Sequence, residues 1–190
     1  RLWQGVSDPY LFRLVAEVQT VGGKPLDRVE QAFGIRQIAI DPDKGFFLNG
    51  KPLKLRGVGL HQDIEGKGWA MSEAEIAADV ELIRELGANS IRLTHYQHGP
   101  TVHELVDRLG LILWDEIPLV SVWTLGFSQK AASPGLLDNA RQQLRELIRQ
   151  NYNHASVAVW GIANEVDFGA SLPGFLTGNQ GTPDPVPLLR

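Results

Sequence analysis

The spacing of hydrophobic and polar residues divides the chain near residue 54. Upstream of that point, residues 11–20 and 33–40 form two apolar runs, and each run is followed by turn-forming residues such as Gly, Asp or Pro. Runs bounded in this way are typical of strands in a β-sandwich. Because two strands cannot bury a core by themselves, we expect the rest of this sandwich upstream, or a covering supplied by other elements.

Downstream of residue 54, short apolar segments alternate with amphipathic ones. Asn49-Gly50, just before this change, predicts a tight hairpin turn, and Ser72 with Glu75 predicts the capping box of a helix. Continuous apolar strands separated by amphipathic helices indicate a parallel sheet that is buried on both faces. The expected strands are 55–60, 90–94, 111–114 and 157–162, and the expected helices are 72–86, 100–109 and 137–148.

Polar residues stand at the end of each of these strands. The pairs are His61 with Asp63, Arg92 with His95, Asp115 with Glu116, and Asn164 with Glu165. This arrangement suits an α/β barrel, whose chemistry is located at the carboxyl ends of its strands. The sequence therefore predicts an α/β fold with four βα units of a TIM (β/α)8 barrel, which needs eight, preceded by strands of a β-sandwich.

Composition and charge exclude several classes of partner. The net charge is -4 and no basic cluster is present, so nothing indicates binding to nucleic acid or to a membrane surface. No apolar run is long enough to span a bilayer, and the start of the chain does not resemble a signal peptide. The absence of cysteine excludes disulfides but does not fix the compartment. Both ends of the chain read as cuts through a longer protein.

Glu165 is the residue with the clearest chemistry. It follows a buried strand, beside Asn164 and close in sequence to Trp160. A partly apolar environment raises the pKa of a carboxyl group, which can then protonate a glycosidic oxygen. The alternative is a strand-end glutamate that pairs with an arginine.

Four segments resemble glycoside hydrolase family 2, the β-galactosidase and β-glucuronidase family. These are FFLNGKPLKLRGVGLHQD (46–63), GANSIRLTHYQH (87–98), DRLGLILWDEIPL (107–119) and NHASVAVWGIANE (153–165). Upstream, Trp3, Pro9-Tyr10-Leu11 and FGIR (33–36) are similar to the end of the family's immunoglobulin-like domain. The resemblance implies an immunoglobulin-like β-sandwich end at 1–42, and the first four βα units, the N-terminal half of the barrel, at 43–190.

The resemblance also implies roles for the strand-end residues. Glu165 would be the general acid/base, and Asn164 would hydrogen-bond the sugar 2-hydroxyl. The remaining predicted substrate-binding residues are His61, Asp63, Arg92, His95 and Trp123. The resemblance relates His61 and His95 to histidines that line the sugar pocket, Asp63 to a position that can bind a sugar hydroxyl, and Arg92 to an arginine beside the nucleophile. For Trp123 it is the position in a loop that favours a binding role.

Each of these residues also has an ordinary structural explanation. His61 and His95 could simply end strands, and Arg92 could form a structural ion pair with Asp115 or Glu116, alone or together with a substrate contact. The tryptophans at 69, 123 and 160 could stack on sugars or belong to the core. The other three histidines are expected away from the site: His98 and His103 on the outer helix or its loop, and His154 at the amino-terminal end of the fourth strand.

Two features depart from the family pattern. The family's nucleophile comes from barrel strand seven, which this chain does not reach, so we expect the isolated chain to be inactive. Some members bind magnesium through a Glu and a His near positions where this chain has Val120 and Val122. Aliphatic side chains cannot bind a hard cation, so we predict no metal and no cofactor.

Three functions fit these observations. The first is retaining hydrolysis of terminal β-galactosides, the second is β-glucuronide hydrolysis, and the third is a catalytically inactive carbohydrate-binding fragment. The expected partners are a β-galactoside or related carbohydrate and the missing C-terminal half of the barrel. Half a barrel also leaves two strand edges unpaired, which favours association, including with copies of itself.

Overall fold

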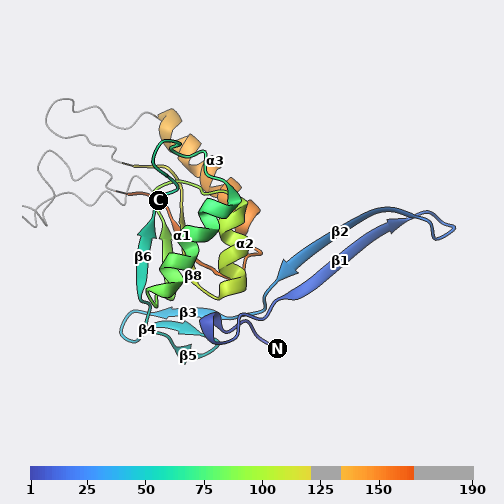
Figure 1. Ribbon diagram of the computed structural model, residues 1–190, viewed down its shortest axis with the longest axis horizontal. Helices are drawn as coiled ribbons and strands as arrows, with labels where there is room; N and C mark the ends of the chain where they lie inside the picture. Colours follow the sequence, from blue (N-terminus) through green and yellow to red (C-terminus); the bar gives the residue numbers. More distant parts are fainter. Residues whose placement is uncertain (121–133, 165–190) are drawn as a thin grey trace, which may run out of the picture.

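The computed structural model describes residues 1–120 and 134–164 of the 190-residue chain. In this part of the chain the strands form three sheets, which are a two-stranded ribbon, a three-stranded sheet and a four-stranded parallel sheet (Figure 1). The strands are β1 (Phe12–Gln19), β2 (Pro25–Phe33), β3 (Ile38–Asp41), β4 (Gly45–Leu48), β5 (Lys51–Pro52), β6 (Gly57–Leu60), β7 (Ser90–Leu93), β8 (Ile112–Glu116) and β9 (Val157–Gly161). The helices are a 3-10 turn, η1 (Gly5–Ser7), and α1 (Glu73–Glu85), α2 (Pro100–Leu109) and α3 (Pro134–Asn151). None of these helices has the length and apolar character needed to cross a membrane.

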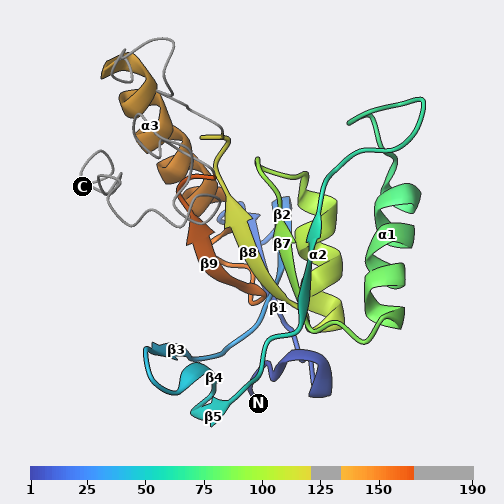
Figure 2. The ribbon, with the colours of Figure 1, turned by 90° about the vertical axis from the view of Figure 1, so that its left-hand side faces the viewer.

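The parallel sheet has the strand order β6-β7-β8-β9, so strands that follow one another in sequence are neighbours in space. Each neighbouring pair is parallel, and Figure 2 shows the four strands running side by side. Helices α1, α2 and α3 lie in sequence between successive strands. This consecutive βα order is that of an α/β barrel, and it brings all four carboxyl ends to one edge.

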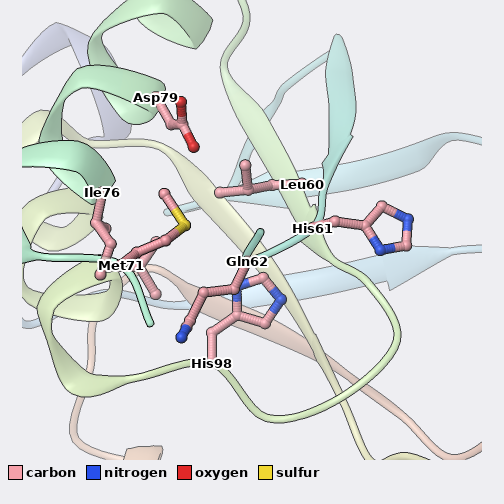
Figure 3. A pocket seen from close by; sticks show the side chains of 8 residues that line it. Leu60, His61, Gln62, Met71, Ile76, Asp79 and His98 are labelled. Atoms are coloured by element: carbon pink, nitrogen blue, oxygen red, sulfur yellow. The ribbon is translucent and has the colours of Figure 1, made fainter. Parts of the chain in front are cut away.

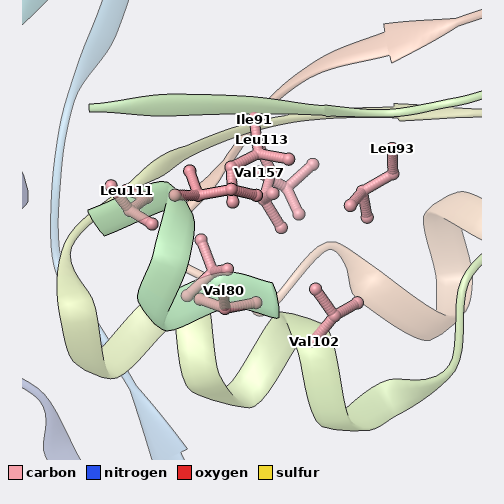
Figure 4. Packing of buried hydrophobic residues seen from close by; sticks show 9 residues of the cluster. Val80, Ile91, Leu93, Val102, Leu111, Leu113 and Val157 are labelled. Atoms are coloured by element: carbon pink, nitrogen blue, oxygen red, sulfur yellow. The ribbon is translucent and has the colours of Figure 1, made fainter. Parts of the chain in front are cut away.

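One face of the parallel sheet packs against α1 and α2. Alternate strand residues point to the helices and form an apolar cluster with them (Figure 4). The cluster contains Val80, Ile83, Ile91, Leu93, Val102, Val106, Leu111, Leu113 and Val157. Burial of each such side chain contributes about 1.5–3 kcal/mol, which makes this cluster a principal source of stability.

The opposite face of the sheet differs from the prediction. Its residues, which include Gly57, Gly59, Ser90, Arg92 and Trp114, line an open hollow. The sequence predicts burial on both faces, whereas the described helices cover one. The reason is that a barrel interior is filled by side chains from all of its strands, and four strands do not close around it.

The predicted helix boundaries are confirmed at both α1 and α2. The hydroxyl of Ser72 accepts a hydrogen bond from the backbone of Glu75, and the Glu75 carboxylate accepts one from the backbone of Ser72, which completes the capping box. Gly87 and Gly110, just beyond the two helices, have φ angles of +76° and +80°. These left-handed conformations favour glycine and end a helix.

The amino-terminal ribbon corrects one expectation. Strands β1 and β2 pair antiparallel and project away from the rest of the molecule (Figure 1). The predicted second strand at 33–40 is not continuous: Phe33 ends β2 and residues 38–40 belong to β3, while the chain between them leaves the ribbon and Arg36 turns toward the barrel. The Arg36 guanidinium donates to the carbonyls of Ala155 at 3.0 Å and Val157 at 2.7 Å, and burial lowers the pKa of Arg36.

Strands β3, β4 and β5 form a small antiparallel sheet below the barrel strands. Its β4–β5 turn is the predicted Asn49-Gly50 hairpin, with both φ angles positive, at 51° and 75°. The boundary predicted at 42/43 falls in the turn between β3 and β4. A second apolar cluster, Trp3, Leu48, Ile112 and Ala155, joins this sheet to the amino-terminal ends of β8 and β9.

Candidate active site

Polar side chains from all four parallel strands lie at their carboxyl ends. Arg92 belongs to β7, Glu116 is the last residue of β8, and His61 directly follows β6. His95 and Asn164 come two and three residues after β7 and β9. The side chains of Arg92, His95, Glu116 and Asn164 form one hydrogen-bonded network, as expected for a site assembled from strand ends.

Arg92 is the centre of this network. Its Nε donates to the carboxylate of Glu116, which is fully buried, while the arginine side chain is one-third exposed. A buried carboxylate without a counter-ion costs several kcal/mol, so Glu116 requires this guanidinium. Of the two ion-pair partners predicted for Arg92, the structure contains Glu116. His95 Nδ1 lies 3.3 Å from the same carboxylate and, when it carries the proton, donates to it.

The same arginine fixes the amide of Asn164. A terminal nitrogen of Arg92 donates to Oδ1 of Asn164 at 2.8 Å. Because an arginine can only donate, this bond assigns the amide orientation and leaves Nδ2 of Asn164 as a hydrogen-bond donor. The Asn164 backbone is held as well, since its N–H donates to the carbonyl of Leu119 at 2.9 Å.

Trp114 and Gly161 set the space around the ion pair. The guanidinium carbon of Arg92 lies 5.1 Å from the centre of a Trp114 ring, within the range of a cation–π interaction. A Cβ at Gly161 would lie 2.5 Å from Nε1 of Trp114 and 2.6 Å from Cγ of Glu116. Trp114 and Glu116 thus occupy the space that a side chain at position 161 would need, and glycine is the residue that fits there. Sequence reasoning missed Trp114 and Gly161 as residues of the site, and the only signal was their position in apolar strands.

The predicted site residues after β6 are exposed. The rings of His61 and His95 are nearly perpendicular, with centres 5.3 Å apart, so His61 lies beside the Arg92 network. Asp63 is also exposed. Within the described residues, no hydrogen bond joins Asp63 to the network.

Two predicted site residues, Glu165 and Trp123, lie outside the described residues. The other tryptophans considered for sugar stacking are described, and they differ. Trp160 is partly buried against the apolar clusters of the sheet and α3, whereas Trp69 is 64% exposed.

Three of the remaining polar residues form a buried cluster behind the site. His103 lies in α2, as expected, but it is fully buried, with Nε2 at 2.9 Å from Oδ2 of Asp115. Asn151 donates to the same oxygen at 3.0 Å. This cluster ties β8, one residue before Glu116, to the helix layer. At the other end of the strands, His154 Nδ1 lies 2.7 Å from Asp107, in the amino-terminal position predicted for it.

The described residues do not fit the magnesium site of some family members. Val120, at one of the two positions that the resemblance relates to metal ligands, has no side-chain atom that binds a hard cation. Val122, at the other position, lies outside the described residues. Over residues 1–120 and 134–164, no group of three or more His, Asp or Glu side chains is arranged to hold a metal ion.

Comparisons with known proteins agree with this geometry. A family model described as "Glycosyl hydrolases family 2, TIM barrel domain" matches residues 38–177. The chain is 43% identical over 168 residues to a beta-glucuronidase of Bacteroides fragilis, covering 87% of this chain and 24% of that protein. It is 32% identical over 166 residues to a beta-galactosidase of Bacteroides ovatus, covering 87% of this chain and 19% of that protein.

Solved structures give the same result. A Bifidobacterium dentium beta-glucuronidase complexed with coumarin-3-O-glucuronide superposes with a TM-score of 0.80 at 32% identity, covering 91% of this chain and 27% of that one. A putative beta-galactosidase from Bacteroides fragilis has a TM-score of 0.77 at 43% identity, covering 87% and 23%. The chain thus spans about a quarter of the length of such relatives. It belongs to glycosyl hydrolase family 2, and its parallel sheet is part of that family's TIM barrel domain.

Proposed function

We propose that this chain supplies the acid/base half of the active site of a retaining β-glycoside hydrolase. The observation that supports the proposal best is the hydrogen bond from Arg92 to Asn164. It presents the amide nitrogen of Asn164 as a donor at the edge of the sheet where TIM barrels carry their catalytic groups. In the family resemblance, Asn164 and Glu165 are the Asn-Glu pair of barrel strand four.

In the proposed reaction, a nucleophilic carboxylate bonds to the anomeric carbon and forms a covalent glycosyl-enzyme. Glu165 protonates the glycosidic oxygen as the bond to the leaving group breaks. It then removes a proton from the water that releases the sugar. Asn164 donates to the sugar 2-hydroxyl, an interaction that strengthens in the oxocarbenium-like transition state. Arg92 has two roles in this proposal. It orients Asn164, and it neutralises the carboxylate of Glu116 close to the reacting sugar.

Retention requires a second carboxylate about 5–5.5 Å from the acid/base. Glu116 does not fit this role, because its carboxylate is fully buried and bound to Arg92. We propose that the nucleophile comes from a later barrel strand of a longer protein, as in the family. On this proposal the isolated chain is inactive.

The substrate proposed first is a β-glucuronide. The beta-glucuronidases of Bacteroides fragilis and Streptococcus agalactiae are 43% and 33% identical to this chain, which supports this choice. The β-galactoside expected from the sequence is the second candidate. Relatives named beta-galactosidase, such as that of Vibrio cholerae at 31% identity, support it.

The finer assignments of the sequence remain proposals. His61, His95, Asp63 and Trp123 are proposed to line the sugar pocket. Residues 43–190 are proposed as the N-terminal half of the barrel, with four βα units, and residues 1–42 as the end of an immunoglobulin-like domain. The proposed partners are the carbohydrate substrate, the other barrel half and further copies of the protein.

The test is a rate comparison on the longest chain that the gene encodes. Nitrophenyl β-glucuronide and nitrophenyl β-galactoside are the substrates, and Glu165→Gln is the control. The proposal predicts turnover of one of them, loss of about 10²–10⁴-fold in the variant, and a β-configured first product. A soluble, folded protein that hydrolyses neither substrate, or a variant as fast as the wild type, contradicts it.

A further inference from the structure

Three aromatic rings form a stack beside the candidate site. The rings of Trp69 and Tyr96 are 4.4 Å apart at an interplanar angle of 30°, and those of Tyr96 and His98 are 5.1 Å apart at 19°. The stack runs from solvent to core, because Trp69 is 64% exposed and His98 is 5% exposed. One face of the Trp69 indole therefore rests on a supported ring, and the rest of the side chain is open to solvent.

The stack is anchored to the site histidines through their sequence neighbours. Gln62 follows His61, and Tyr96 follows His95. The backbone N–H of Gln62 donates to the Tyr96 hydroxyl at 3.0 Å, and its side chain donates to the carbonyl of Trp69 at 3.3 Å. Because the rings of His61 and His95 are themselves in contact, the position of Trp69 is fixed relative to the carboxyl ends of the parallel strands.

The inner end of the stack is closed. Figure 3 shows Gln62 and His98 on one side of a small cavity, with His61 pointing away from it. This cavity measures about 10 Å³, the space of about one water molecule. A ligand ring therefore has access to the stack at its outer end, the exposed indole of Trp69, and not at His98.

We propose that Trp69 is a stacking platform for the six-membered ring that a glycoside carries on its leaving-group side. In this proposal the carboxyl ends of the strands hold the sugar to be cleaved. The leaving-group ring extends outward from that sugar and packs on Trp69, which lies beside the strand ends. The flat apolar face of a pyranose or aryl ring packs well on an indole. Trp69 is already ordered by Tyr96 and Gln62, so little conformational entropy is lost on binding. This inference rests on the proposed glycosidase function.

The kinetic test compares leaving groups that differ in having a ring. Substrates are the nitrophenyl β-glycoside and the β-glycosyl fluoride of whichever sugar the complete protein hydrolyses. Trp69→Ala should raise KM for the nitrophenyl glycoside about three- to tenfold and leave KM for the fluoride unchanged, while Trp69→Phe should retain most of the affinity. Tyr152→Ala is the matched control, because Tyr152 is 62% exposed but lies between α3 and β9, at the amino-terminal end of the strands. It should change neither constant.

Equal effects of Trp69→Ala on both substrates, or a lowered melting temperature with no substrate preference, would show that Trp69 packs against the protein instead. A binding measurement separates this inference from the proposed activity. Calorimetric titration with phenyl 1-thio-β-glucuronide and phenyl 1-thio-β-galactoside, which resist hydrolysis, should give a Kd about three- to tenfold weaker in Trp69→Ala. If the wild type hydrolyses nothing but the variant loses thioglycoside affinity, the activity proposal fails and the platform stands. An unchanged Kd, or no binding of either probe to the wild type, overturns the platform.

Discussion

A methyl group added at Gly161 should disturb the whole Arg92 network. A Cβ at this position of β9 would lie 2.5 Å from Nε1 of Trp114 and 2.6 Å from Cγ of Glu116. Non-bonded carbon contacts are favourable at about 3.5–4.0 Å, so both side chains must move by about 1 Å. Glu116 cannot move alone, since it is fully buried and bound to Arg92, which in turn orients Asn164.

The structure gives the size of both effects of Gly161→Ala. Overpacking of a filled interior costs about 1–3 kcal/mol, which urea denaturation of the complete protein would measure. A displacement of about 1 Å near the reacting groups can lower the rate by about 10²-fold. We therefore expect kcat for the nitrophenyl glycoside to fall by about 10- to 100-fold.

A second glycine of the same sheet provides the control. A Cβ at Gly59 in β6 would have its nearest contact at 3.3 Å, with the Cγ2 methyl of Thr94. A shift of a few tenths of an ångström accommodates it, so Gly59→Ala should lose less than about 1 kcal/mol and keep a kcat close to wild type. If Gly161→Ala retained the wild-type kcat, or if both variants lost equally, the reasoning about this close contact would be refuted.

Three further perturbations test the electrostatics. Arg92→Met leaves the buried Glu116 without its counter-ion and should cost about 3 kcal/mol, the low end for buried pairs because the arginine is one-third exposed. Adding Glu116→Gln should recover part of this loss in urea denaturation, and a simple sum of the two losses would argue against the pair. Hydrogen bonds from Lys67 and from the helix cap lower the pKa of Glu75 from 4.5 to about 2. Its stabilisation is therefore present above pH 4.5 and lost as the pH falls toward 2, so melting temperatures of Glu75→Gln should depend less on pH in that window. Burial lowers the pKa of His98 below 6.5, so as the pH falls the unfolded chain binds a proton at His98 before the folded protein does, and acid below pH 6.5 destabilises the fold. His98→Gln should make the melting temperature less sensitive to pH in this range, and an unchanged dependence of melting temperature on pH would contradict this.

The parallel strands were predictable because each is a short apolar segment between turn or helix signals. Strand β2 was not, because four of the nine residues of Pro25–Phe33 are polar and almost all of the strand is exposed, and its pairing with β1 supplies what its composition does not. The predicted strand at 33–40 is interrupted at residues 34–37 for a tertiary reason. Arg36 leaves the strand direction to bond carbonyls more than a hundred residues away, and no local pattern indicates such a contact.

The candidate site was predictable in its location and less so in its bonds. Strand-end positions of Arg92, His95 and Asn164 follow from the βα alternation, but the choice between Asp115 and Glu116 as the partner of Arg92 does not. It depends on which of two successive residues points to the inner face of β8. The buried contact of His103 with Asp115 joins a helix to a strand, which is beyond what residue spacing alone can indicate.

Azide rescue of Glu165→Ala tests most directly whether Glu165 is the acid/base. A dinitrophenyl β-glycoside of the hydrolysed sugar has a leaving group that needs no acid, so the first step survives in the variant and water attack becomes slow. Azide needs no general base and attacks from the side that water would use. We predict that azide restores turnover of the complete Glu165→Ala protein and yields the β-glycosyl azide. The role assigned to Glu165 would be contradicted if the variant turned over at the wild-type rate without azide, if azide did not restore turnover, or if the product were the α-glycosyl azide.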